Sequence, residues 1–263
     1  MNSILKVSIK AAVEAGKSIL EIYNSDLFDI DFKNDGSPLT RADMASNKII
    51  KSYLSETKFP ILSEEDKIIP FKERKKWDRL WIVDPLDGTK EFIKRNDEFT
   101  VNIAFIENQN TLAGVIYAPA LDLLYFSYKE LGSFKASIDI NNNINIDNLI
   151  SNATRLPVPR NDKLFTIVAS RSHMSNETEE FTKKMHDKHK QIKLISKGSS
   201  LKFCMVAEGK ADCYPRFAPT MEWDTAAGQS ICENAGYQVI DLKNNKKMLY
   251  NRENLLNNSF LVT

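Results

Sequence analysis

Two carboxylates, Asp84 and Asp87, stand three residues apart at the end of an apolar run that begins at Trp81. Pro85 lies between them and favours a tight turn, which would bring both carboxylates to one side and leave the Leu86 carbonyl without a strand partner. Carboxylate and carbonyl oxygens are the hard ligands that Mg²⁺ prefers. This stretch therefore predicts a site for divalent cations at the end of a buried strand.

A helix is predicted to begin directly after these carboxylates, at Gly88 and Thr89. The first N–H groups of a helix have no partner within it, so they form a natural seat for phosphate. Cations beside such a seat neutralise phosphate charge and activate water. The pattern is typical of a metal-dependent phosphatase.

Further acidic residues follow another short strand. Glu64 and Glu65 come directly after the apolar pair Ile61 and Leu62. Carboxylates that follow apolar strands tend to converge at one edge of a sheet, and like charges brought close together need cations. We therefore expect this pair to join the two aspartates.

Two other aspartates have an ordinary structural interpretation as well as a functional one. Asp224 precedes a helix predicted from Thr225, so it fits an N-cap. Asp43 stands three residues after Thr40, which is capping-box spacing at the start of another predicted helix. Their local sequence leaves both interpretations open.

The elements that must position these residues alternate along the chain. Apolar spacing of three and four residues predicts helices over 4–23, 40–55, 176–189, 199–208 and 225–235. Apolar and β-branched runs predict strands over 61–62, 80–83, 99–107, 111–117, 123–128, 165–169, 191–195, 211–214, 238–242 and 260–262. The three strands between 99 and 128 are expected to be antiparallel neighbours. The Asn-rich stretch 138–152, predicted as a loop or sheet-edge excursion, divides the chain into halves 1–150 and 151–263, with the site between them.

Composition excludes several classes of function. The chain has 263 residues, 42% of them hydrophobic and 27% charged, and a net charge of +1, so we expect no nucleic-acid partner. No apolar run approaches the roughly 18 residues of a membrane span, so no integral membrane segment is expected. The three cysteines show no metal-type spacing, which favours reduced thiols and a cytoplasmic protein.

Three motifs in this order resemble the inositol monophosphatase superfamily of metal-dependent, lithium-sensitive phosphatases. They are Asp84–Thr89, the preceding Glu64–Glu65 pair, and Trp223–Ala227, and the similarity extends over about residues 37–236. The resemblance implies an α/β (α+β) fold, a layered αβαβα sandwich of the inositol monophosphatase and fructose-1,6-bisphosphatase type.

Other segments are similar to the bacterial 3'(2'),5'-bisphosphate nucleotidases of the CysQ type within that superfamily. These segments are 62–66, 90–96, 198–204 and 214–217. The similarity implies Mg²⁺-dependent removal of the 3'-phosphate from adenosine 3',5'-bisphosphate, a by-product of sulfur metabolism, by direct attack of a metal-activated water. The partner would be a small nucleotide substrate.

The resemblance also implies a role for each matching residue. The metal ligands, for two or three Mg²⁺ ions, would be Glu64, Asp84, the Leu86 carbonyl, Asp87 and Asp224, with Glu65 outside the ligand set. Asp43 and Thr89 would orient the attacking water, with help from Glu64. The scissile phosphate would contact Glu64, Leu86, Asp87, Gly88, Thr89 and Asp224, with Gly88 and Thr89 contributing their N–H groups.

Contacts to the nucleotide and its second phosphate are implied for four residues, His173, Ser199, Lys202 and Arg216. From the residues alone, the same four positions fit a surface histidine, a helix cap, a solvated lysine and a loop arginine.

Several alternatives stay open. Haloacid-dehalogenase phosphatases use a similar Asp-x-Asp-x-Thr motif, but its spacing is one residue shorter and it forms an aspartyl-phosphate. The substrate within the superfamily could instead be inositol monophosphate or another sugar phosphate, although segments 90–92 and 198–202 argue against both. A catalytically silent sensor of a phosphorylated nucleotide is the non-enzymatic alternative. The sequence leaves open a monomer or a homodimer, and peripheral association with the cytoplasmic face of the inner membrane.

Overall fold

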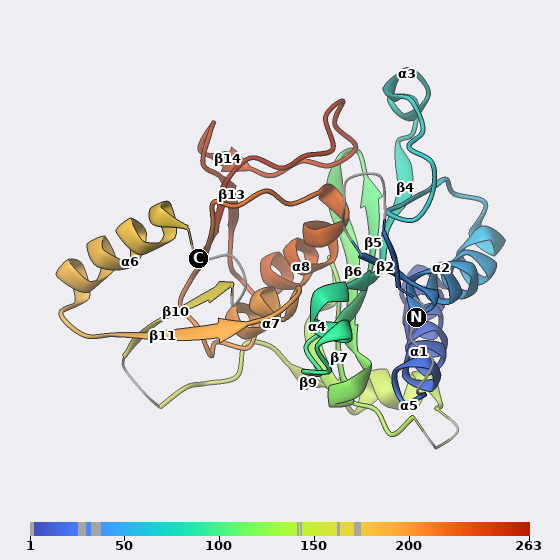
Figure 1. Ribbon diagram of the computed structural model, residues 1–263, viewed down its shortest axis with the longest axis horizontal. Helices are drawn as coiled ribbons and strands as arrows, with labels where there is room; N and C mark the ends of the chain where they lie inside the picture. The colour runs from blue at the N-terminus through green and yellow to red at the C-terminus, as the bar shows by residue number, and fades with distance from the viewer. Residues whose placement is uncertain are drawn as a thin grey trace.

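The computed structural model describes residues 3–25, 30–32, 38–140, 142, 144–161, 164–170 and 175–263 (Figure 1). The helices are α1 (Ser3–Tyr23), α2 (Arg41–Leu54), α3 (Phe71–Arg74), α4 (Thr89–Ile93), α5 (Ile146–Ser151), α6 (Asn176–His189), α7 (Leu201–Ala207) and α8 (Glu222–Asn234), with 3₁₀ turns at Ser55–Thr57 and Pro119–Leu121. The strands are β1 (Ile30–Phe32), β2 (Pro38–Thr40), β3 (Ile61–Ser63), β4 (Arg79–Asp87), β5 (Thr100–Glu107), β6 (Asn110–Ala118), β7 (Leu123–Tyr128), β8 (Gly132–Ser137), β9 (Thr154–Arg155), β10 (Phe165–Ser170), β11 (Ile192–Lys197), β12 (Tyr214–Arg216), β13 (Val239–Asp241), β14 (Lys246–Lys247) and β15 (Phe260–Val262).

The central sheet has seven described strands in the order β3-β4-β5-β6-β7-β8-β9. β3 runs parallel to β4, and the remaining neighbours in this order are antiparallel. The predicted antiparallel run is confirmed as β5, β6 and β7. Both β3 and β4 therefore end at the same edge of the sheet.

Strand β4 is buried on both faces, which explains its continuous apolar sequence. Trp81 and Val83 pack in the core beneath α1 and α2, whereas Leu80 and Ile82 pack in the core on the opposite face. Because successive side chains of a strand point to opposite faces, the same run serves both cores.

The elements form five layers (Figure 1). Helices α1 and α2 cover one face of the central sheet, and α7 and α8 lie against the other. A second sheet, β12-β15-β13-β14, follows, together with the parallel pair β10-β11 and the outer helix α6. The predicted αβαβα sandwich is confirmed.

The second half follows the predicted alternation with small shifts. The helix predicted over 176–189 is confirmed as α6, while the strand predicted over 211–214 lies at Tyr214–Arg216. Cys213, placed in that strand, instead forms an isolated parallel bridge with Ile167 of β10. This bridge joins the parallel pair to the second sheet.

The Asn-rich stretch contains a helix, α5, where a loop or an edge excursion was predicted. Its side chains Ile146, Leu149 and Ile150 pack against the core beneath α1. These three apolar residues are spaced as one helical face, and that periodicity was masked by the surrounding asparagines. Asn141 and Asn143 lie outside the described residues.

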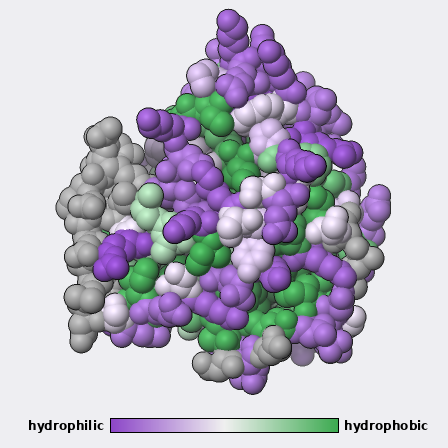
Figure 2. All heavy atoms as spheres, turned by 90° about the vertical axis from the view of Figure 1, so that its right-hand side faces the viewer, coloured by the Kyte–Doolittle hydropathy of each residue, from purple (hydrophilic) through white to green (hydrophobic). Residues whose placement is uncertain are grey.

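Figure 2 shows the face formed by α1 and α2, where hydrophilic residues prevail over scattered apolar ones. Both helices turn their apolar residues inward, as an amphipathic helix on a sheet must. Within the described ranges, no helix is long and apolar enough to cross a bilayer. The three cysteines are unpaired, as predicted, and all three are buried.

Candidate active site

Strand β4 continues through the motif that was predicted to turn. Asp84 pairs with Asn102 and Asp87 with Thr100, so the register shifts between them and forms a bulge. Pro85 is tolerated in the bulge because its missing N–H is not needed there. Its carbonyl accepts a hydrogen bond of 2.6 Å from Ser46 of α2. The predicted tight turn is therefore wrong, but both carboxylates still reach the sheet edge.

Gly88 turns the chain from β4 into α4. Its φ of +90° lies in the left-handed region that favours glycine, and an added Cβ would lie 3.2 Å from the Glu98 carbonyl oxygen. Helix α4 begins at Thr89, as predicted, and is only five residues long. This turn fixes the Thr89 side chain close to the end of the strand.

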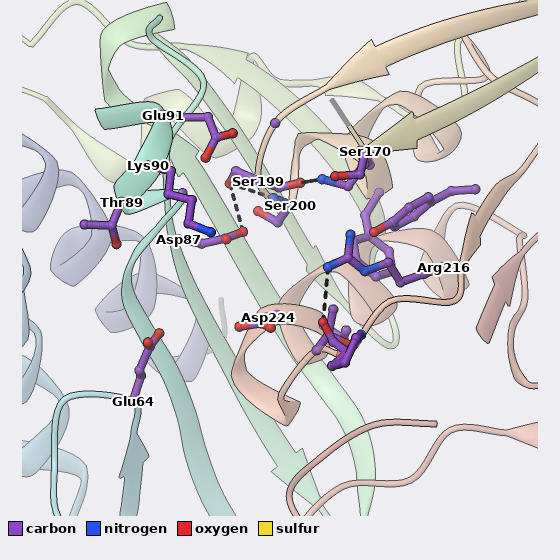
Figure 3. Close-up of a pocket in the computed structure, with 18 residues that line it drawn as sticks. Glu64, Asp87, Thr89, Lys90, Glu91, Ser170, Ser199, Ser200, Arg216 and Asp224 are labelled. Carbon is purple, nitrogen blue, oxygen red and sulfur yellow. Dashed lines mark hydrogen bonds between the residues drawn. The ribbon is translucent and has the colours of Figure 1, made fainter. Parts of the chain in front are cut away.

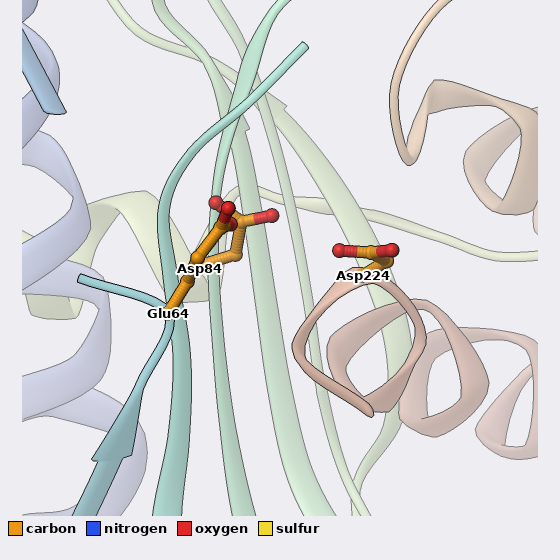
Figure 4. A group of neighbouring side chains, drawn as sticks. All are labelled: Glu64, Asp84 and Asp224. Carbon is orange, nitrogen blue, oxygen red and sulfur yellow. The ribbon is translucent and has the colours of Figure 1, made fainter. Parts of the chain in front are cut away.

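Three carboxylates from distant parts of the chain meet at this edge (Figure 4). Glu64, Asp84 and Asp224 each offer an oxygen, and these oxygens lie within 4.8 Å of one another. Glu64 is placed by the parallel pairing of β3 with β4, because its N–H donates to the Val83 carbonyl at 3.1 Å. We call these three residues the acidic cluster.

Asp224 reaches the cluster from the start of α8. This helix begins at Glu222, three residues earlier than predicted, so Asp224 lies in its first turn and is not the N-cap. One oxygen, Oδ2, accepts the Met221 N–H at 2.8 Å. Asp224 also lines the cavity described below.

The acidic cluster is electrostatically unfavourable by itself. Burial, and then the nearby charges of Glu64, Asp87 and Asp224, raise the pKa of Asp84 well above its usual value. Burial, followed by the charges of Asp87 and Glu64, raises the pKa of Asp224 to about 8. Close carboxylates favour protonation or a bound cation. These oxygens fit Mg²⁺, which takes hard oxygen ligands.

Asp43 caps helix α2 and also contacts Thr89. Its Oδ2 accepts the Thr40 N–H at 2.7 Å and the Thr40 hydroxyl at 2.6 Å, which completes the capping box of α2. Its Oδ1 accepts a hydrogen bond of 3.3 Å from the Thr89 hydroxyl. The predicted pairing of Asp43 with Thr89 is thus present, and Asp43 is buried.

A cavity of about 300 Å³ opens between the two halves of the chain (Figure 3). It is lined by Glu64, Asp87, Gly88, Thr89, Lys90, Glu91, Ser170, Gly198, Ser199, Ser200, Lys202, Phe203, Tyr214, Arg216, Pro219, Thr220, Asp224 and Thr225. Some of the predicted metal, water-orienting and nucleotide residues therefore share one cavity. Asp43, Asp84 and Leu86 are not among the residues that line it. His173 lies outside the described residues.

Two cations on the second half of the chain form what we call the basic wall, Lys202 and Arg216. Lys202 Nζ donates to the Ser199 carbonyl and lies 5.6 Å from the Tyr214 ring centroid. Arg216 donates to the carbonyls of Ala218 and Pro219, each at 3.1 Å. Burial lowers the pKa of Lys202 to about 8.

A buried polar network next to the cavity was missed by the sequence analysis. Ser199 donates to Asp87 Oδ2 at 2.8 Å, and Ser200 donates to the Asn102 side-chain carbonyl at 2.7 Å. Thr100 contacts both serine hydroxyls. The available signal was the alternation of Thr100 and Asn102 along an otherwise apolar strand, which places both on one face.

Comparisons with known proteins agree with this geometry. The sequence profile described as the inositol monophosphatase family matches residues 1–261. The chain is 40% identical over 263 residues to the protein of Salmonella typhimurium named 3'(2'),5'-bisphosphate nucleotidase CysQ, and the match covers 99% of both chains. A protein of the same name from Buchnera aphidicola is 42% identical over 231 residues, covering 87% of this chain and 80% of that protein.

Solved structures show the same similarity. The crystal structure of CysQ from Bacteroides thetaiotaomicron, a bacterial member of the inositol monophosphatase family, matches with a TM-score of 0.91 and 48% identity. That match covers 99% of this chain and 96% of the other. The IMPase of Thermotoga maritima matches with a TM-score of 0.76 at 23% identity, covering 100% and 92% of the two chains, which supports the fold alone.

Proposed function

Because this chain belongs to the inositol monophosphatase family, as its motifs predicted, we propose that it is a 3'(2'),5'-bisphosphate nucleotidase. The proposed reaction removes the 3'-phosphate of adenosine 3',5'-bisphosphate and yields AMP and inorganic phosphate. Full-length relatives with that name support the substrate class. The observation that carries the proposal is one cavity lined by Glu64 and Asp224 of the acidic cluster and by both cations of the basic wall.

The proposed ligands of two or three Mg²⁺ ions are all oxygen donors: Glu64, Asp84, the Leu86 carbonyl, Asp87 and Asp224. The raised pKa of Asp84 supports this assignment, because it reflects negative charge that a cation would balance. When bound, such ions neutralise phosphate charge and lower the pKa of water.

Thr89 and Asp43 are proposed to orient the attacking water. An ionised carboxylate only accepts hydrogen bonds, so the Thr89 hydroxyl donates its proton to Asp43. Its lone pairs are then available to accept a hydrogen bond from a water in the cavity. That hydrogen bond would orient the water for in-line attack on phosphorus, while the N–H groups of Gly88 and Thr89 contact the scissile phosphate.

Lys202 and Arg216 are proposed to bind the second phosphate. Both cations line the cavity, and both are held by backbone carbonyls, so they need little rearrangement to receive an anion. An inositol monophosphate carries no second phosphate for this wall. The arrangement therefore favours a bisphosphate over an inositol monophosphate.

A panel of substrates tests the function. Phosphate release would be measured from adenosine 3',5'-bisphosphate, inositol 1-phosphate and fructose 1,6-bisphosphate, with AMP as the control that lacks a 3'-phosphate. We expect the highest kcat/KM for the first compound, no release without Mg²⁺, and inhibition by Li⁺. Preference for inositol 1-phosphate would identify a sugar phosphatase, and nucleotide binding without release would identify the silent sensor.

We also propose a cytoplasmic location, supported by the three unpaired cysteines. A monomer or a homodimer is proposed as the assembly, and light scattering of the purified protein would distinguish them. Flotation with anionic vesicles would test whether the protein associates with a membrane surface.

A further inference from the structure

The turn that carries Ser199 into the cavity has an unusual backbone. Ser199 has a φ of +51°, in the left-handed region that residues with a Cβ rarely adopt. A glycine at this position would relieve the strain, yet the chain keeps a serine. Strain of this kind persists where the surrounding structure enforces it, and it clusters at functional sites.

The hydroxyl of Ser199 has a defined direction. Asp87, when ionised, can only accept, so Ser199 donates its single proton to Asp87 Oδ2 at 2.8 Å (Figure 3). Ser199 Oγ also accepts the Ser200 N–H at 2.6 Å and contacts the Thr100 hydroxyl. The proton of Ser199 is therefore committed to a carboxylate and is not available to a nucleotide.

Strand β5 and Glu98, which precedes it, hold the turn in this conformation. Glu98 accepts the Gly198 N–H at 2.8 Å and forms an ion pair of 3.0 Å with Lys197. Thr100, the first residue of β5, contacts the Ser199 hydroxyl. The turn of the second half is thus fixed to the sheet of the first half, next to Asp87.

The consequence for Asp87 is a fixed orientation. Its Oδ2 accepts a hydrogen bond from the Ser199 hydroxyl and another, at 3.4 Å, from the Asn102 amide. Among the described residues, Oδ1 receives no hydrogen bond, and Asp87 is close enough to Asp84 and Asp224 to raise the pKa of both. One oxygen is therefore held by the turn while the other is left for the acidic cluster.

We propose that Ser199 is a positioning residue for the metal centre, which orients Asp87 through its strained turn. Serine is kept at a left-handed position because glycine, which would remove the strain, has no hydroxyl to hold the carboxylate. The proposal rests on the metal-dependent part of the proposed function and not on the identity of the nucleotide.

Metal affinity and thermal stability separate this role from a purely structural one. Mg²⁺ binding by calorimetry, and Mn²⁺ binding by electron paramagnetic resonance, would be measured without substrate for the wild type, Ser199→Ala and Ser199→Gly. We expect both variants to bind metal roughly tenfold more weakly, as is typical for loss of a partner that orients a ligand. Ser199→Gly should melt no lower than Ser199→Ala, because it relieves the backbone strain.

Ser200→Ala is the matched control. Ser200 belongs to the same turn and network, but its φ is −70° and its hydroxyl donates to Asn102, not to Asp87. We expect its metal affinity to stay within about twofold of the wild type, because Asp87 keeps its orienting partner. Wild-type affinity in Ser199→Ala, or an equal loss in Ser200→Ala, would overturn the proposal.

The outcome is independent of the substrate test. If the wild type binds metal but releases no phosphate from the bisphosphate, the proposed function fails while the role of Ser199 is still measured. If the wild type is active and the Ser199 variants bind metal normally, only the positioning role fails.

Discussion

Glu64 and Asp224 of the acidic cluster line the same cavity as the basic wall, but the charges of the two groups are satisfied in different ways. Carboxylates of the cluster lie against one another, and their mutual repulsion contributes to the raised pKa of Asp84. The cations of the wall are held by backbone carbonyls of their own half of the chain. The charge of the cluster is balanced by protonation or by a bound cation, whereas the wall is organised before any ligand binds.

This difference separates the expected effects of mutation. Changes in the cluster should alter kcat, metal affinity and the stability of the metal-free protein together, because one set of charges governs all three. Changes in the wall should alter substrate affinity with little effect on the chemical step.

The largest effect is expected for Asp87→Asn. The amide keeps the shape of the side chain but removes a negative charge that balances the cations, so we expect kcat to fall at least about 100-fold with saturating Mg²⁺. Steady-state phosphate release measures the change. Asp187→Asn, on the exposed face of α6, is the control with unchanged kcat. Near-normal turnover in Asp87→Asn would remove this residue from the metal site.

The basic wall should respond mainly in KM. Charge-assisted contacts to phosphate contribute roughly 1.5–3 kcal/mol each, so Arg216→Ala or Lys202→Ala should raise KM for the bisphosphate about ten- to a hundredfold. We expect kcat to change much less, because neither residue belongs to the acidic cluster. Lys94→Ala, an exposed lysine outside the cavity, controls for net charge. Unchanged KM in both wall variants would exclude them from the substrate site.

A smaller effect is expected for the stability of the metal-free protein, and here the substitution of a cluster residue should bring a gain and not a loss. Asp84→Asn removes a buried charge from a repelling cluster, so this variant should melt at least about 3 °C above the wild type in EDTA. Calorimetry with and without Mg²⁺ measures the difference. In the variant, Mg²⁺ should add little stability because a ligand is missing. Lower stability than the wild type in EDTA would contradict the electrostatic account.

The pH dependence of the stability of the metal-free protein follows from Asp224. Its folded pKa of about 8 is above the usual value of 3.8, so between these limits the folded state binds more protons than the unfolded chain. Metal-free wild type should therefore lose stability as the pH rises from about 4 to about 8. Asp84→Asn should reduce this loss, because Asp84, whose own pKa is also raised, no longer titrates.

The convergence of the acidic residues could be predicted because it depends on local features. Glu64 and Asp84 each follow a short apolar run, and the two strands lie side by side. The bulge at Pro85 could not be predicted, because a turn and a bulge both accommodate a residue without an N–H. The choice between them is made by tertiary contacts such as the hydrogen bond from Ser46.

The contacts between the halves could not be predicted at all. Ser199 lies 112 residues from Asp87 and 99 from Thr100, and no local pattern encodes pairing over that distance. The start of α8 was misplaced for a related reason. Met221 and Glu222 lack the usual N-cap chemistry, and Asp224 supplies its capping bond from within the first turn. Aspartate therefore serves the helix and the cluster at once.

The smallest effect tests whether Lys202 binds substrate as a cation. Its pKa of about 8 is below the usual value of 10.5 because it is buried, so it loses its proton within the working range of the assay. If the charged form contacts the second phosphate, kcat/KM should fall severalfold as the pH rises through about 8. A pH–rate profile from 6.5 to 9.5 at saturating Mg²⁺ measures this.

Two variants test whether the fall in kcat/KM near pH 8, the break in the pH–rate profile, belongs to Lys202. Lys202→Met should lower kcat/KM and remove the break, because no titrating group remains at that position. Arg216→Ala should keep the break but move it to higher pH, since the nearby guanidinium lowers the pKa of Lys202 and does not itself titrate. A break that persists unchanged in Lys202→Met belongs to another group, and the basic wall would then act through Arg216 alone.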